Sequence, residues 1–192
     1  MTTAAPAIPG SNHALIRSLL LALFTAGGIG GAAAQSSPAP TAGSQAPPVS
    51  VNGWSYQHGG SDVHIFRCEQ PSCGAGSKVT YRLYAAKNPM TLQQFRESQD
   101  QIIKALEQRK PGQRITLLGV DGAKGTAVPR MYRARRLTVT PDGTSEYQVN
   151  GLLFGTRASA SLISSARDEK ASNDNYAKFA AAVMLALAPK TR

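Results

Sequence analysis

The stretch Cys68-Glu69-Gln70-Pro71-Ser72-Cys73 lies between two runs in which apolar and polar residues alternate. The first run is 62–68, and the second is Lys78-Val79-Thr80-Tyr81-Arg82-Leu83-Tyr84. Such alternation is typical of β-strands, and a Pro-Ser-Cys-Gly sequence between two of them is typical of a turn. The stretch therefore predicts a hairpin early in the fold.

Cys68 and Cys73 are the chain's two cysteines and stand five positions apart. A redox pair would be expected to form Cys-x-x-Cys at a helix start, and these cysteines meet neither condition. A metal site could recruit His58 and His64, but the spacing matches no common zinc pattern, and His64 and Cys68 would lie about 13 Å apart on a strand. We therefore predict a structural disulfide formed in an oxidising compartment, and no metal ion.

Residues 1–34 have the pattern of a secretory signal peptide. They hold no acidic residue, one arginine (Arg17), the apolar run 19–24 and three alanines at 32–34. The apolar run is well short of the roughly 20 residues that a membrane-spanning helix needs. We expect cleavage after Ala34, no membrane span thereafter and a periplasmic or secreted location. Retention of the segment as an anchor is the alternative.

The chain after this segment divides by composition. Residues 35–50 are rich in Ser, Pro and Ala and carry no charge, which is typical of a flexible tether. We expect one folded domain at 51–188 and a short tail at 189–192.

The two runs of the hairpin differ in pattern. In the first, apolar Val63 and Ile65 alternate with His64 and Phe66, so this strand is expected to be covered on both faces. In the second, Val79 and its alternate neighbours form one apolar side, as in an antiparallel sheet with one side facing water.

Two segments change to the helical period. The first follows Thr91, which forms a predicted capping box with Gln94, and stops at Pro111-Gly112. The second is 174–187, with Ser172 or Asn173 as its cap. Further strands are expected at 54–56, 115–120, 127–140, 147–155 and 159–165. This order predicts an α+β fold, an antiparallel sheet of about six to seven strands with two amphipathic helices packed on it.

Positive charge is concentrated in the window 104–136, which holds nine Lys and Arg residues against two acidic ones. We expect an anionic envelope component or an acidic protein to bind there, the alternative being a merely solvated surface. Nucleic acid is not expected, because only Tyr132 is interleaved with the final arginines as a stacking aromatic. The predicted partner-binding residues are Arg109, Lys110, Arg114, Arg130, Arg133, Arg135 and Arg136.

Signals for catalysis are weak, and no cofactor or catalytic residue is predicted. The serines of the pair Ser164-Ser165 precede Asp168-Glu169 and could act as nucleophiles beside carboxylates, which leaves a small secreted hydrolase as an alternative. The usual explanation of that sequence is a strand end followed by the start of a helix. A purely structural envelope protein is a further alternative.

The C-terminal part carries a family resemblance. The run 147–155, the run 161–165 and then a helix with Asn175, Tyr176 and Phe179 are similar to small exported bacterial proteins of unknown function. Their expected architecture resembles the Mog1/PsbP/DcrB-like fold, and the likeness covers 51–188 in the order of elements. The resemblance implies a non-enzymatic accessory or partner-binding role, and no family binding motif is matched.

Overall fold

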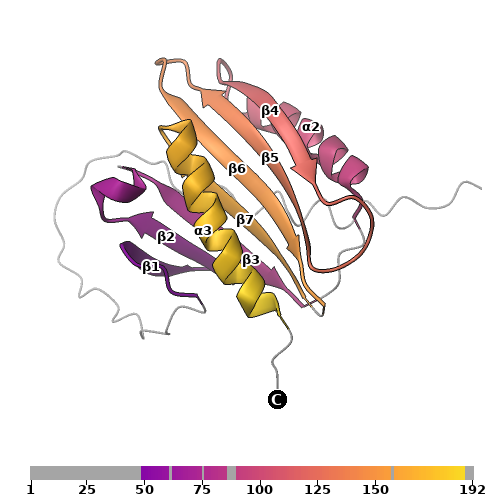
Figure 1. Ribbon diagram of the computed structural model, residues 1–192. Helices are drawn as coiled ribbons and strands as arrows, with labels where there is room; N and C mark the ends of the chain where they lie inside the picture. Colours follow the sequence, from indigo (N-terminus) through magenta and orange to yellow (C-terminus); the bar gives the residue numbers. More distant parts are fainter. Residues whose placement is uncertain (1–48, 61, 75, 86–89, 157, 189–192) are drawn as a thin grey trace, which may run out of the picture. The chain divides into compact units, whose positions relative to one another are not determined.

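The computed structural model describes residues 49–60, 62–74, 76–85, 90–156 and 158–188. The expected signal peptide, the tether up to residue 48 and the tail at 189–192 lie outside these ranges. Within them, seven strands form one antiparallel sheet in the order β1-β2-β3-β7-β6-β5-β4, with two α-helices packed on it (Figure 1). The predicted α+β fold class is confirmed.

The strands and helices follow one another in the predicted order. The strands are β1 (Trp54–Gly59), β2 (Val63–Cys68), β3 (Lys78–Tyr84), β4 (Arg114–Gly122), β5 (Arg130–Val139), β6 (Ser145–Phe154) and β7 (Ser159–Ala166). The helices are α2 (Leu92–Arg109), α3 (Glu169–Leu187) and the short 3-10 turn η1 (Pro71–Cys73).

The sheet consists of two meanders joined along one seam. Strands β1 to β3 form the first and β4 to β7 the second, and β3 pairs with β7, from Lys78 opposite Ser165 to Tyr84 opposite Ser159. The segment containing α2 connects β3 at the seam with β4 at the far edge (Figure 1).

The two helices cover opposite faces of the sheet. On β5, Tyr132 packs against Phe95 of α2, whereas Arg135 points the other way and pairs with Glu169 of α3. We call these sides the α2 face and the α3 face. Helix α3 crosses β6, β7 and β3, while α2 packs on β4 and β5 (Figure 1).

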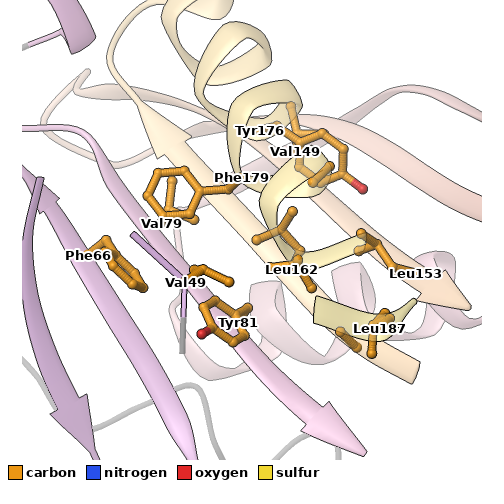
Figure 2. Packing of buried hydrophobic residues seen from close by; sticks show 13 residues of the cluster. Val49, Phe66, Val79, Tyr81, Val149, Leu153, Leu162, Tyr176, Phe179 and Leu187 are labelled. Atoms are coloured by element: carbon orange, nitrogen blue, oxygen red, sulfur yellow. The ribbon is translucent and has the colours of Figure 1, made fainter. Parts of the chain in front are cut away.

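The main core lies on the α3 face. Phe179 is fully buried, and its ring lies 5.0 Å from that of Trp54 and 4.9 Å from that of Phe66, measured between centroids. Figure 2 shows Val49 among these core residues, although it falls within the expected tether. The other buried members are Val79, Tyr81, Val149, Leu153, Ala160, Leu162, Tyr176, Ala180, Val183 and Leu187.

The α2 face has a smaller core, and part of the face is uncovered. Its buried members are Phe95, Tyr132, Ala134, Leu152 and Phe154. Because α2 packs on β4 and β5, Val63 and Ile65 of β2 stay partly exposed while Phe66 is 1% exposed. Strand β2 is therefore covered only in part on the α2 face.

The helix starts follow from their caps. Thr91 accepts from the Gln94 backbone, and the Gln94 side chain accepts from the Thr91 backbone, so the predicted capping box is confirmed. Helix α3 begins at Glu169 rather than near residue 174, because Asp168 caps it by accepting from Ala171 N at 2.8 Å. Ser172, expected as a cap, is fully buried inside the helix.

Because β6 packs closely against α3, we predict that a larger residue in place of Gly151 destabilises the fold. A Cβ on Gly151 would lie 1.8 Å from Tyr176 Oη, so Gly151→Ala should lower the free energy of unfolding by about 1–3 kcal/mol. Urea denaturation measures this. The control is Gly60→Ala, whose Cβ would meet nothing within 4 Å. Equal losses in both variants would contradict the packing described here.

Candidate functional site

The cysteines form the predicted disulfide. Cys68 and Cys73 are bonded, with Cα atoms 5.9 Å apart, and η1 ends at Cys73. Asn175 of α3 donates to the Cys73 carbonyl at 2.8 Å and ties the hairpin loop to the helix. The disulfide fits an exported protein, because such bonds persist in oxidising compartments.

Two of the predicted partner-binding arginines are buried on the α2 face. Arg136 is 3% exposed and donates to Gln148 Oε1 at 3.1 Å and to Asn150 Oδ1 at 2.8 Å. Burial lowers the pKa of Arg136 to about 10, and the charge of Glu146 acts in the opposite direction. Arg130 is 8% exposed, with its guanidinium carbon 4.3 Å from the centroid of the Phe154 ring.

Two others lie on the α3 face in ion pairs. Arg133 Nε is 2.7 Å from Asp121 Oδ1, and Arg135 Nη1 is 3.8 Å from Glu169 Oε1. Successive residues of a strand point to opposite faces, so the four arginines of β5 do not form one surface. The four arginines predicted to bind a partner are thus divided between two faces of the sheet, and their role in binding stays a prediction.

The remaining three predicted cations lie together at the connection between α2 and β4. Arg109 ends α2, Lys110 follows it and Arg114 begins β4, and all three are exposed. Gly112 in this turn packs near Pro141 of the next turn along the sheet end, since a Cβ there would lie 3.0 Å from Pro141 Cγ. We call Arg109, Lys110 and Arg114 the turn cluster.

Among the described residues, no base forms a hydrogen bond with the hydroxyl group of Ser164 or Ser165, although Lys78 lies opposite Ser165 in the sheet. Ser164 is fully buried on the α3 face, its Oγ without a hydrogen-bond partner, and Ser165 points to the other face. Asp168 caps α3 and Glu169 pairs with Arg135. Acyl transfer by serine needs a base within hydrogen-bond reach, and no such hydrogen bond is present among the described residues.

His58 and His64 face each other across the β1–β2 hairpin, with ring centroids 5.6 Å apart. Tyr56 Oη is 3.0 Å from His64 Nδ1, and the Tyr81 ring stacks on His64. Desolvation by burial lowers the pKa of His64, aided by the charge of His58 and opposed by Asp62. Across the residues that the structure places, no three metal-ligating side chains gather.

A pocket that the sequence did not reveal lies on the α2 face, at the same end of the sheet as the turn cluster. Its volume is about 250 Å³. It is lined by Arg67, Gly76, Lys78, Thr144, Ser145, Glu146, Ser165, Ala166 and Arg167. These residues come from segments that are distant in the sequence and become neighbours only through strand register, so no local motif marks them.

For the described part of the chain, neither helix is long and apolar enough to cross a membrane. No protein-family model matches the chain, and no curated protein matches its sequence.

The fold is similar to that of a solved structure, the solution structure of cyanobacterial PsbP (CyanoP) from Synechocystis sp. PCC 6803. The TM-score is 0.51 at 10% sequence identity, and the match covers 68% of this chain and 81% of that chain. At this identity the likeness shows the fold alone, so the chain has a PsbP-like fold, as the sequence resemblance implied.

Removing the disulfide tests how far it stabilises the hairpin. Cys68→Ser combined with Cys73→Ser should lower the free energy of unfolding by about 2 kcal/mol. The loss is expected to be this small because the disulfide closes a short loop. Thermal or urea unfolding with and without reductant measures this. In the double variant reductant should have no further effect; an undiminished response to reductant would contradict the assignment.

The histidine environment predicts a pH dependence. The folded state holds the pKa of His64 below the ordinary value of 6.5, so the unfolded chain takes up the proton more readily. The contribution of His64 to stability is present above pH 6.5 and is lost as the pH falls below it. Urea unfolding between pH 8 and pH 5 should show a smaller loss in His64→Gln than in the wild type, and identical losses would contradict this.

Proposed function

We propose that this chain is an exported, non-enzymatic binding or accessory protein of the cell envelope that contacts an anionic partner through a basic surface. The observation that carries the proposal is the turn cluster, in which three cations stand exposed around one connection. Its chemistry suits an anionic envelope component or an acidic protein, because guanidinium groups bind carboxylate and phosphate.

Long-range electrostatics support the same proposal. The net charge is +10, and it falls to +9 when Arg17 leaves with the expected signal peptide. A charge of this sign attracts anionic partners over about 8 Å at physiological ionic strength. The PsbP-like fold adds an analogy with accessory proteins, which supports the coarse role and no particular partner.

Charge reversal tests the proposal. In Arg109→Glu/Lys110→Glu/Arg114→Glu, retention of the purified protein on envelope extract at low salt should fall to background, because the contact is electrostatic. The matched control is Arg96→Glu/Lys124→Glu/Lys178→Glu, which changes the net charge equally at exposed positions elsewhere.

Both triple variants are checked by urea unfolding before binding is compared. The control variant should keep most of the salt-sensitive retention. Equal retention by the two variants would sink the proposal, since net charge alone would then account for binding.

A further inference from the structure

Strand register places a row of polar side chains across the α2 face. Arg67 of β2 pairs with Lys78 of β3, Lys78 with Ser165 of β7, and Ser165 with Gln148 of β6. Paired residues on adjacent strands lie about 5 Å apart and point to the same face. Arg67 and Lys78 are exposed, since α2 packs farther along the sheet on β4 and β5.

Arg67, Lys78 and Ser165 of this row line the pocket described above, together with Arg167, which follows β7. Thr144, in the turn between β5 and β6, and Ser145, the first residue of β6, also line it. The pocket thus brings together side chains from both meanders, across the seam between β3 and β7.

The three cations of the pocket have no acidic partner among the described residues. No ion pair or side-chain hydrogen bond joins Arg67, Lys78 or Arg167 to any residue that the structure places. The pocket's single carboxylate, Glu146, instead accepts from Gln148 Nε2 at 3.3 Å.

Gln148 is held in turn by the buried Arg136, which donates to its Oε1 at 3.1 Å. The two hydrogen bonds, from Arg136 to Gln148 and from Gln148 to Glu146, hold the Glu146 carboxylate at the pocket. The three pocket cations and this one carboxylate leave a net charge of +2 in the pocket lining.

We propose that this pocket binds a phosphate group. A phosphate carries roughly two negative charges near neutral pH, which matches the pocket lining, whereas a carboxylate carries one. Guanidinium forks and a serine hydroxyl are suitable donors to its oxygens. At about 250 Å³ the pocket is smaller than the sites of drug-sized ligands, and it has room for a phosphate group.

The phosphate site is separate from the turn cluster. The two use different cations, Arg67, Lys78 and Arg167 here against Arg109, Lys110 and Arg114 there, and their tests use different probes. Either proposal can therefore fail without the other.

Calorimetric titration of the whole protein with inorganic phosphate tests the site. Arg67→Gln, Lys78→Gln and Arg167→Gln should each weaken phosphate binding about tenfold, because each removes a charge-assisted contact. Lys124→Gln, the same charge change outside the pocket, should leave binding unchanged. Acetate, with a single charge, should bind more weakly than phosphate.

A gain of affinity gives an independent readout. Glu146→Gln removes the pocket's carboxylate, so phosphate should bind several-fold more tightly. Weakened or unchanged binding in this variant, or an equal loss in Lys124→Gln and Arg67→Gln, would overturn the proposal. The proposal would also be overturned if the wild type bound neither inorganic phosphate nor vesicles that contain phosphatidic acid.

Vesicles distinguish the source of the phosphate group. Co-sedimentation with neutral phosphatidylcholine vesicles that contain phosphatidic acid, and with vesicles that lack it, compares a lipid headgroup with free phosphate. Vesicle binding that requires phosphatidic acid and is lost in Arg67→Gln and Lys78→Gln supports the site and assigns a lipid source. Phosphate binding without vesicle binding supports the site and assigns a soluble source.

Discussion

The pairing of β3 with β7 is the interaction on which the rest of the structure depends. It joins the two meanders, from Lys78 opposite Ser165 to Tyr84 opposite Ser159, and it makes one sheet of seven strands. Helix α3 lies across this seam and supplies Phe179 and Val183 to a core drawn from both meanders. Without the seam each meander would keep an unpaired edge and only part of an apolar face.

Much of the fold was predictable because local chemistry decides it. Alternation in 78–84 predicts the faces of β3, and the Thr91 and Gln94 pair predicts the start of α2. The order of the strands in the sheet was not predictable. Alternation of apolar and polar residues shows which side chains share a face of a strand, but it does not show which strands pair with each other. The start of α3 was misplaced because Asp168 caps the helix six positions before the apolar stretch that begins at residue 174.

The candidate sites show the same division between local and long-range information. The arginines of β5 are close in sequence, yet alternation separates them, and burial removes Arg130 and Arg136 from the surface. The pocket cations Arg67, Lys78 and Arg167 are distant in sequence, yet register brings them together. Charge density along the chain therefore indicated where cations are frequent, while their grouping in space depends on the strand pairings.

The central position of β3 and β7 has a consequence for biosynthesis. The strand that completes the seam and the helix that covers it are the last elements of the domain. Because synthesis runs from the N-terminus, β3 can pair with β2 early but has no partner on its other side until β7 has been made. The seven-stranded sheet can therefore be completed only late in synthesis, and the open edge of β3 is the place where another chain could add a strand.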